Sequence, residues 1–455
     1  MKKSRGYIAV LVVGAVLGFY VAQPLFNAPT VQAQALTSEQ RATLQAEYDQ
    51  LQQEIAQWQK VLDETKAKKN TLTGDVTALN AQIAKAQKEI KQRSITISTL
   101  GSEITQKTAT IKTLEQRLEA GQEALAKLMR QKNEAEQRPL AILALSSDDL
   151  SSFFSDVQNI DTIDAELQNL FATLRGVKTE TQKEKEALND RKNAELDARH
   201  EVVVKQTQIK ENQTEKQKLL DITKKEEGAY QQVLAERQRK AAEIYARLFP
   251  LRDTEAIKFG DAVAYANTAA LKTGVRPVLI LAILSQESGL GTNVGNCFVT
   301  NLSTGSGKGK NTGTPIAGVM KAPRDTVPFE RITKALGKDW SSTPVSCPQS
   351  SGYGGAMGPT QFIPSTWELF APRIEKALGV PATNPWNAEH AIMATGLYLS
   401  DAGAGAQTYT AERNAACKYF SGSKCPASGW IANYANSVIA KANAYEKDIA
   451  ALADL

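Results

Sequence analysis

The stretch TGVRPVLILAILSQESGLG, residues 273–291, decides how the C-terminal half of the chain is interpreted. Pro277 suits the first turn of a helix, and Gly289 suits the residue just past its end. Residues 278–284 between them are apolar on every face of that helix, which is typical of a core element. Glu287 then falls in the last turn, at the boundary of the buried region. It is either a catalytic carboxyl group at the edge of a cleft or the ordinary solvated end of a buried helix.

The environment of Glu287 suits acid catalysis. A carboxyl group half buried at the end of such a helix would have its pKa raised, because burial disfavours the charged form. A general acid that works near neutral pH requires a raised pKa of this kind. Many buried helices also end in a solvated glutamate, so the rest of the sequence must decide between the two interpretations.

Proline and glycine divide the chain into two parts. Only four of the 16 prolines and eight of the 29 glycines fall within residues 1–250. Residues 36–249 are therefore expected to form long helices, and residues 250–455 a globular domain with frequent turns. We predict a mainly α protein, in which a long antiparallel coiled-coil hairpin precedes an α-helical globular domain.

Heptad repeats define the first helical arm. A register that begins at Tyr48 and repeats every seven residues as far as Leu125 carries Ile or Leu at most of its positions. Its companion positions are mostly Leu and are interrupted by Thr65, Arg93, Lys107 and Gly121. The unshifted register predicts one continuous arm of roughly 130 Å.

The second arm, residues 163–247, keeps this spacing less faithfully. Four charged residues interrupt its seam: Glu184, Arg191, Glu195 and Lys205. So polar a seam is weak alone, and we expect the second arm to pair back onto the first. The tip at about 138–161 lacks heptads and carries several apolar residues: Leu140, Ile142, Leu143, Phe153 and Phe154. They form either a docking surface or the packing of the hairpin's own turn.

Residues 1–35 carry the features of an export signal. Three basic residues within the first five precede an apolar run from Tyr7 to about Ala22, and the small residues of VQAQA, 31–35, suit cleavage. The alternative is an uncleaved membrane anchor, for which the run is a little short of the roughly 20 residues that cross a bilayer. The remainder of the chain is expected to be exported, periplasmic or extracellular.

All four cysteines lie in the C-terminal half, which export would place in a compartment that permits disulfides. Four cysteines allow three pairings, and the sequence alone does not choose among them. The short intervening loop favours Cys417 with Cys425, which leaves Cys297 with Cys347.

The residue inventory excludes several kinds of chemistry. The chain has two histidines, His200 in the second arm and His390 in the globular domain. A zinc peptidase commonly needs two or more histidine ligands, and the globular domain has one, so no metal site is expected. A cysteine nucleophile is not expected either, since all four cysteines look committed to disulfides. His390 is interpreted as a polar helix position. A net charge of +5 is too small to indicate nucleic acid, although it suits an anionic cell-wall surface.

A second motif favours the catalytic interpretation of Glu287. In YGGAMGPTQFIPSTW, residues 353–367, a glycine-rich loop leads into a helix whose start we predict from a capping box of Ser365 and Glu368. Glycines such as Gly358 allow a backbone to approach a ligand closely, and Gln361 offers a sugar both a donor and an acceptor. Farther on, Asn387 is expected to cap a further core helix.

Taken together and in this order, these motifs resemble the catalytic domain of lytic transglycosylases, members of the lysozyme-like superfamily. The resemblance covers about residues 251–450. The matching stretches are the pair Glu287-Ser288, the signature Gly358–Trp367, the helix Asn384–Ile392 and the late motif Tyr434–Val438. Many relatives have Tyr-Asn where this chain has Tyr419-Phe420. An insert at about 296–352 is also unusual, and its cysteines indicate a disulfide-tied flap beside the cleft.

This resemblance implies a lysozyme-like fold and cleavage of peptidoglycan glycan strands. Glu287 would act as the catalytic acid, and then as the base that leads to a 1,6-anhydro sugar. The residues that would position the sugar are Ser288, Met357, Gly358, Gln361, Tyr419 and Tyr434. No metal or organic cofactor is implied. The alternatives are a muramidase that uses water and an inactive glycan-binding scaffold.

The hairpin resembles the coiled coils of bacterial division-associated cell-wall hydrolases and their activators. The resemblance rests on the architecture and on the stretch LSSDDLSSFFSDVQNI, residues 145–160. It implies a membrane partner related to ABC transporters, bound through the tip, and a role of the hairpin in regulating or localising the enzyme.

Overall fold

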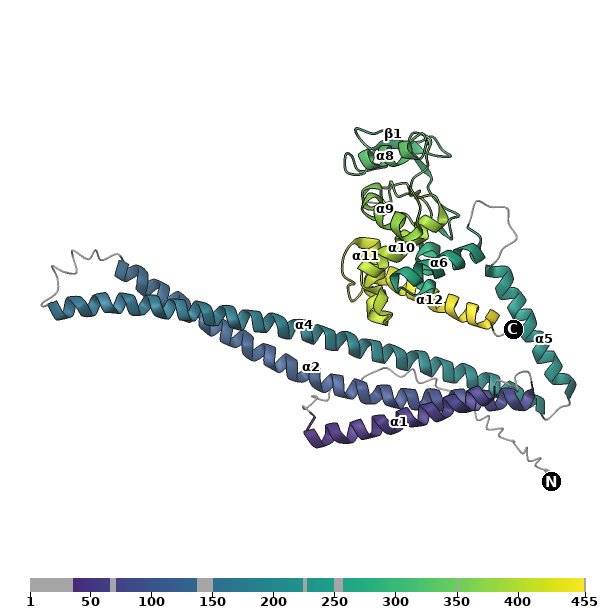
Figure 1. The fold of residues 1–455 in the computed structure, drawn as a ribbon, viewed down its shortest axis with the longest axis horizontal. Helices are drawn as coiled ribbons and strands as arrows, with labels where there is room; N and C mark the ends of the chain where they lie inside the picture. The colour runs from purple at the N-terminus through teal and green to yellow at the C-terminus, as the bar shows by residue number, and fades with distance from the viewer. Residues whose placement is uncertain are drawn as a thin grey trace, which may run out of the picture.

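The computed structural model describes residues 36–65, 71–136, 150–223, 227–248, 257–349 and 352–453. These residues confirm a mainly α chain, in which a long antiparallel helical pair is followed by a helical globular region (Figure 1). The expected export signal, residues 1–35, lies outside the described residues. Among the helices that are described, none is long and apolar enough to cross a membrane.

The hairpin consists of α2, Leu72–Glu136, and α4, Leu150–Thr223, and its pairing is antiparallel as predicted. Lys107 pairs with Glu184 at 2.9 Å, and Lys132 with Asp164 at 2.5 Å nearer the tip. Of the apolar tip residues, Leu140, Ile142 and Leu143 lie outside the described residues, and Phe153 and Phe154 fall near the start of α4, where the structure does not describe their side chains.

The prediction of a single continuous first arm is wrong. The helix α1, Ser38–Thr65, is separate from α2 and folds back against it. Its direction is antiparallel, since Lys88 pairs with Glu54 at 2.5 Å and Lys91 with Glu47 at 2.9 Å. The break follows Thr65, at the point where the sequence places the successive polar residues Thr65 and Lys69 on the seam. A continuous helix would bury no apolar side chain there, so the chain reverses at little cost.

The other interruptions of the heptads fit one another across the hairpin. Lys107 and Glu184 each interrupt their own arm and form one ion pair together. A Cβ at Gly121 would lie 2.4 Å from Cδ2 of Leu174, so this glycine makes room for a leucine of the opposite arm. Similar cross-arm ion pairs are Arg93–Glu201, Arg191–Glu103 and Lys205–Glu89. These positions fix the register in which the two arms pair.

The second arm is also divided, since α4 ends at Thr223 and α5 spans Glu227–Leu248. Arg237 of α5 pairs with Asp75 of α2 at 2.6 Å and with Glu215 of α4 at 3.2 Å. These contacts anchor α5 at the base of the hairpin, and from there it runs toward the globular region (Figure 1).

The globular region is built around the buried helix α7, Pro277–Ser288. It begins with Pro277 in its first turn and ends at Gly289 in the left-handed conformation, as predicted. It packs against α6, Phe259–Thr273, α10, Ala388–Asp401, and α12, Trp430–Ala453. The remaining helical elements are α9, Pro364–Leu378, the short 3-10 turn η2, Ala404–Ala406, and α11, Tyr409–Ser421.

Two predicted helix starts have different outcomes. Asn387 caps α10, and its side chain accepts a hydrogen bond from the His390 backbone, as expected. The predicted capping box of α9 is wrong, because the helix begins at Pro364 after Ile363 and has no side-chain cap. The hydroxyl of Ser365 donates instead to the buried carboxylate of Asp325 at 2.5 Å. A buried carboxylate needs donors more than an exposed helix end does.

The insert forms a small subdomain whose buried residues, such as Val299 and Phe329, continue the core of the globular region. Three antiparallel strands, β1 Cys297–Asn301, β2 Ser306–Gly309 and β3 Pro315–Ile316, are followed by α8, Thr326–Ala335. In Figure 1, β1 and α8 lie at the end of the globular region remote from the hairpin. The disulfides Cys297–Cys347 and Cys417–Cys425 confirm the pairing that loop length favoured.

Candidate active site

Glu287 lies in the last turn of α7, where the helix passes from fully buried residues to partly exposed ones. The hydroxyl of Tyr434, from α12, donates a hydrogen bond to Oε1 of Glu287. The adjacent Gln286 is also held by α12, because Lys441 donates to its Oε1 at 2.5 Å and Ser437 donates to it at 3.1 Å. The end of α7 is therefore held against α12 at Gln286 and at Glu287.

Burial raises the pKa of Glu287 above its usual value, and the hydrogen bond from Tyr434 opposes that shift only in part. The pKa of Tyr434 is raised well above its own usual value by burial and by the charge of Glu287. The phenol therefore stays protonated and remains a donor throughout the physiological range. A carboxyl group with a raised pKa and a permanent donor is equipped to give and to accept a proton.

Ser288 supports the turn that follows α7. Its side chain is buried, and its hydroxyl donates to the carbonyl of Leu284 at 3.2 Å. The same oxygen accepts a hydrogen bond from the backbone of Gly291 at 2.7 Å. These contacts place the Ser288 hydroxyl within the protein, where it holds the shape of the loop beside Glu287.

The glycine-rich loop approaches the core closely. The side chain of Met357 is fully buried, so that only its backbone can serve a ligand. Gly358 has φ +63°, and a Cβ there would lie 1.9 Å from the carbonyl oxygen of Pro385. Gln361, with φ 58°, donates from Nε2 to the carbonyl of Gly358 at 2.7 Å. The close approach of Gly358 to Pro385 packs the loop against the stretch that precedes α10.

Tyr419 of α11 contacts the same loop through its hydroxyl group. Its hydroxyl donates to the carbonyl of Thr360 at 2.6 Å and lies 3.3 Å from the hydroxyl of Thr395. Burial, and secondarily the charge of Glu287, raise its pKa well above the usual range. The Tyr419 hydroxyl is thus engaged with the glycine-rich loop, and the contact between Tyr419 and a glycan stays a prediction.

Sequence reasoning missed the aromatic neighbours of Tyr434. Phe420 stacks on Tyr434 with the ring centroids 4.3 Å apart and the planes at 5°. Trp430 contacts Phe420 edge to face, at 5.0 Å and 79°. The only signal in the sequence was the departure from Tyr-Asn to Tyr419-Phe420.

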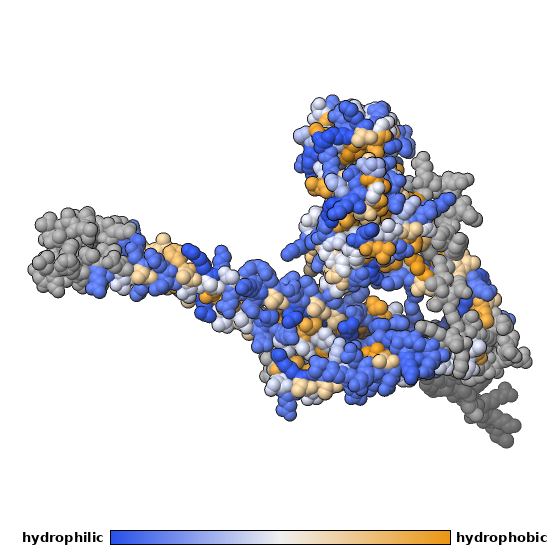
Figure 2. All heavy atoms as spheres, in the orientation of Figure 1, coloured by the Kyte–Doolittle hydropathy of each residue, from blue (hydrophilic) through white to orange (hydrophobic). Residues whose placement is uncertain are grey.

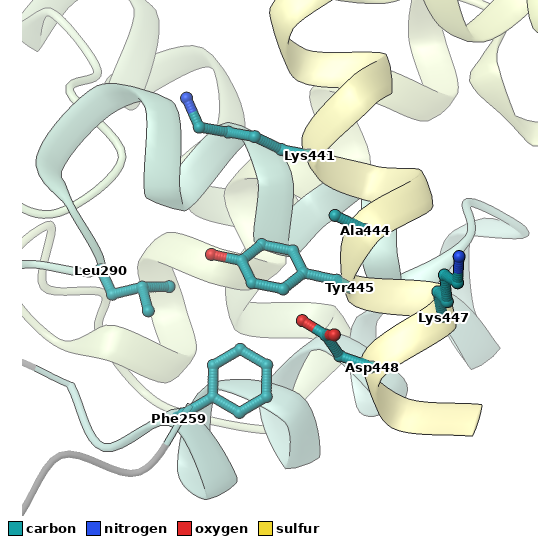
Figure 3. A pocket seen from close by; sticks show the side chains of 7 residues that line it. All are labelled: Phe259, Leu290, Lys441, Ala444, Tyr445, Lys447 and Asp448. Carbon is teal, nitrogen blue, oxygen red and sulfur yellow. The ribbon is translucent and has the colours of Figure 1, made fainter. Parts of the chain in front are cut away.

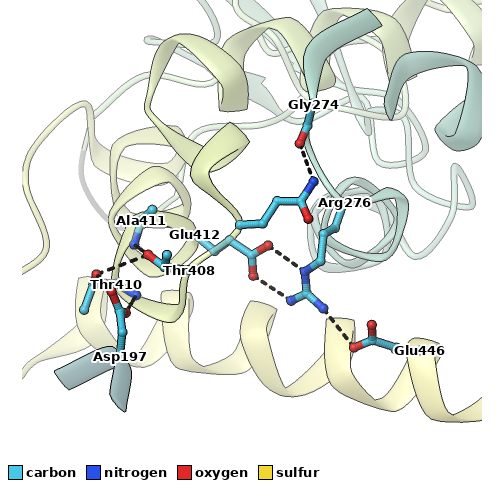
Figure 4. Close-up of polar contacts among 9 residues, drawn as sticks. Asp197, Gly274, Arg276, Thr408, Thr410, Ala411, Glu412 and Glu446 are labelled. Carbon is cyan, nitrogen blue, oxygen red and sulfur yellow. Dashed lines mark hydrogen bonds and ion pairs between the residues drawn. The ribbon is translucent and has the colours of Figure 1, made fainter. Parts of the chain in front are cut away.

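A buried ion pair at the start of α7 was missed as well. Arg276 donates from Nε and Nη2 to the two carboxylate oxygens of Glu412 in α11, at 2.7 and 2.6 Å (Figure 4). Its Nη1 donates to Glu446 of α12 at 2.8 Å. Glu412 is only 2% exposed. Thus α7 is held by α11 at Arg276, the residue just before its first turn, and by α12 at its last turn.

Neither a histidine nor a metal site accompanies Glu287 among the described residues. His390 accepts a hydrogen bond at Nδ1 from the Asn384 backbone at 3.0 Å, which is a structural role. In the described part of the chain, no three His, Cys, Asp or Glu side chains are grouped so that they could hold a metal ion.

A hollow of about 350 Å³ lies nearby, between α6, the turn after α7 and the C-terminal part of α12 (Figure 3). Its apolar wall includes Phe259, Leu290 and Tyr445, and Lys441 lies at its edge. Neither Glu287 nor Tyr434 lines it. The hollow is therefore separate from the candidate carboxyl group and its hydrogen bond.

Residues 195–418 match the family model described as Transglycosylase SLT domain. The match includes Glu287 and the glycine-rich loop, begins within α4 and ends before Tyr434. No curated protein and no solved structure matches the chain. A transglycosylase SLT domain implies peptidoglycan lytic transglycosylase activity in general, with glycan strands as the substrate. Together with the two disulfides it indicates an extracytoplasmic protein.

Proposed function

We propose that this chain cleaves the bond between N-acetylmuramic acid and N-acetylglucosamine in peptidoglycan and leaves a 1,6-anhydro-muramic acid end. The observation that carries the proposal is the half-buried carboxyl group of Glu287, which accepts a hydrogen bond from Tyr434 and has a raised pKa. It lies within the residues that match the transglycosylase family.

One carboxyl group serves both steps of this reaction. Protonated Glu287 gives its proton to the glycosidic oxygen, the bond from that oxygen to C1 breaks, and the N-acetylglucosamine part leaves with a hydroxyl group. The Glu287 carboxylate then takes the proton of the C6 hydroxyl, while the C6 oxygen forms its new bond to C1. Glu287 is thereby returned to its protonated form, so no second carboxyl group is needed.

The neighbouring residues divide into contact and support. Gln361 and the backbone of Met357 and Gly358 are proposed to hold the sugar on the open side of the loop. The buried Ser288 and the partly buried Tyr419 keep the loops in place through their hydrogen bonds. Tyr434 steadies the carboxylate between the two proton transfers, because its hydroxyl remains a donor throughout.

The test is product analysis with purified peptidoglycan and the full chain. Glu287→Gln is expected to lower the rate by about 10²–10⁴-fold, since the amide cannot transfer the proton. Glu375→Gln, on α9, is the matched control and should cleave as the unaltered chain does. Mass spectrometry should show anhydro-muropeptides. Reducing ends would indicate a muramidase in which water attacks C1, and full activity of Glu287→Gln would remove this residue from the role of acid.

Contacts between the hairpin and the globular region support a regulatory role for the coiled coil. Asp197 of α4 accepts hydrogen bonds from the backbone and the hydroxyl of Thr410, at 2.7 and 3.0 Å (Figure 4). The ring of His200 stacks on Tyr409 at 4.0 Å. Both partners lie in the first turn of α11, and α11 carries Tyr419 near its other end.

The hairpin thus touches a helix that supports the site. Docking of the tip on a membrane complex related to ABC transporters, as at division, would pull on α4 and change this contact. The double variant Asp197→Ala/His200→Ala should then alter glycan cleavage by the full chain, whereas Asp190→Ala on the same helix should not. Equal cleavage rates for the unaltered chain, the double variant and Asp190→Ala would mean that the hairpin only localises the enzyme. Export through the N-terminal segment is part of the same proposal.

A further inference from the structure

Three aromatic rings lead from the surface of the globular region to the candidate catalytic carboxyl group. Trp430, the first residue of α12, is 68% exposed, Phe420 is 36% exposed and Tyr434 is 9% exposed. Trp430 contacts Phe420, Phe420 stacks on Tyr434, and Tyr434 donates to Glu287. The exposed rings therefore continue directly from the site, only one ring away from the carboxyl group.

The two exposed rings are held rigidly. The disulfide Cys417–Cys425 joins α11 to the loop that precedes α12, and so links the segments that carry Phe420 and Trp430. Arg413 of α11 also donates to the side chain of Asn436 of α12 at 2.9 Å. A surface that is already ordered loses little conformational entropy when a ligand binds to it.

An indole this exposed contributes little to the folding of the domain. Most of its apolar area stays in water, and the gain of about 25 cal/mol per Å² applies only to area that is removed from water. The rings also carry no charge. A neutral partner with one apolar face, such as a pyranose ring with its C–H groups, would bury this surface and keep its own hydroxyl groups in water.

We propose that Phe420 and Trp430 form a saccharide-stacking platform, which holds a pyranose ring of the glycan strand beside the bond that Glu287 cleaves. This inference rests on the proposed function for the identity of the sugar. It assigns a binding role to the position at which the chain departs from the Tyr-Asn of many relatives. An aromatic ring there recognises the face of a sugar, whereas an amide would recognise its hydrogen-bonding groups.

The first experiment measures binding without turnover. The full chain with Glu287→Gln is titrated with the hexasaccharide of N-acetylglucosamine in a calorimeter. Adding Trp430→Ala should weaken binding roughly fivefold, which is the scale of one aromatic contact. Trp430→Phe should restore most of the affinity. Leu271→Ala removes an even more exposed apolar side chain, 88% exposed, from α6 and is the control that should bind as before.

Unchanged binding by Trp430→Ala would overturn the platform. Phe420→Leu is a second variant, which keeps an apolar contact with Tyr434 and removes the ring. It should weaken binding at least as much as Trp430→Ala does. Circular dichroism of each variant shows whether the fold is retained, and the rescue by Trp430→Phe separates loss of the ring from loss of structure.

A second experiment separates this inference from the proposed function. With Glu287 intact and soluble glycan strands as substrate, Trp430→Ala should raise KM more than it lowers kcat, since the ring binds the sugar and takes no part in proton transfer. Cleavage with an unchanged KM would refute the platform and leave the proposed function standing. A chain that cleaves nothing, yet binds the hexasaccharide through Trp430, would refute the proposed function and retain the platform.

Discussion

Ion pairs have different roles in the hairpin and in the globular region. Lys107 and Glu184 lie at the edge of the α2–α4 seam, where about a quarter of each side chain is exposed. Glu412, which binds Arg276, is only 2% exposed. Water screens the first pair, which selects a register among many similar ones. In the second pair the carboxylate is desolvated, and the pair joins the start of α7, the helix that carries Glu287, to α11.

The two regions also differ in the hydropathy of their surfaces. On the face shown in Figure 2, the described part of the hairpin is mostly hydrophilic, whereas apolar residues show in several places on the globular region. A repetitive seam tolerates local changes because its neighbours supply similar contacts. A site formed by segments far apart in the sequence depends on particular contacts, and each can be tested against a counterpart in the hairpin.

The ion pairs should give the largest difference. Arg276→Met leaves the buried carboxylate of Glu412 without its cation, which is expected to cost about 3–5 kcal/mol of unfolding free energy. Lys107→Met in the hairpin should cost less than about 1 kcal/mol, because its partner can turn to water. Denaturant unfolding measures both, with tryptophan fluorescence for the globular region and helical circular dichroism for the hairpin.

The double variant Arg276→Met/Glu412→Leu is the control for that comparison. It removes both charges, so it should recover much of the stability that Arg276→Met loses. Equal losses from Arg276→Met and Lys107→Met would show that burial does not distinguish the two pairs.

The sequence predicted the hairpin because its information is local and repeated. Even the interruptions were visible as Lys107 and Gly121, although their partners were not. The reversal after Thr65 was missed because a heptad register continues through a break when the residues on both sides stay in phase. The fold-back of α1 depends on contacts with α2, such as Lys91 with Glu47, that no spacing along one helix reveals.

The glycines should give the next largest difference. Gly358→Ala would bring a Cβ within 1.9 Å of a backbone oxygen at φ +63°, and a backbone cannot swing aside as a side chain can. We expect a loss of about 2 kcal/mol or more, together with lower activity. Gly121→Ala displaces only the end of Leu174, and the better helix propensity of alanine offsets about 1 kcal/mol. Its net effect should be close to zero in a thermal melt of the hairpin.

A marked loss from Gly121→Ala, combined with none from Gly358→Ala, would contradict the roles assigned to the two glycines. Gly358 could be selected from the sequence as a close-approach position, but its neighbour Pro385 could not. Glu287, Gly289 and Asn387 were predicted in their places because local signals mark helix ends. The stack of Phe420 on Tyr434 joins α11 to α12 across the disulfide loop, and no local pattern encodes it.

The smallest difference lies in the pH dependence of stability, and here the two regions should differ in sign. Burial raises the folded-state pKa of Glu287 above the usual 4.5. Its contribution to stability is complete below that pH and is lost as the pH rises through the folded pKa, since the unfolded chain gives up the proton first. Glu287→Gln should therefore unfold at a higher denaturant concentration than the unaltered chain at about pH 8, and the advantage should vanish by about pH 4.

Glu54 in the hairpin is the counterpart with the opposite sign. The hydrogen bond from Lys88 lowers its pKa, so its contribution is present above the usual 4.5 and is lost as the pH falls. Glu54→Gln should be slightly less stable than the unaltered chain at neutral pH, with the gap closing on acidification. Tyr434→Phe removes the hydrogen bond that lowers the pKa of Glu287, so its stability should decline more steeply with rising pH. Parallel profiles for all three variants would mean that Glu287 is solvated like an ordinary helix end, and the acid would have to be sought elsewhere.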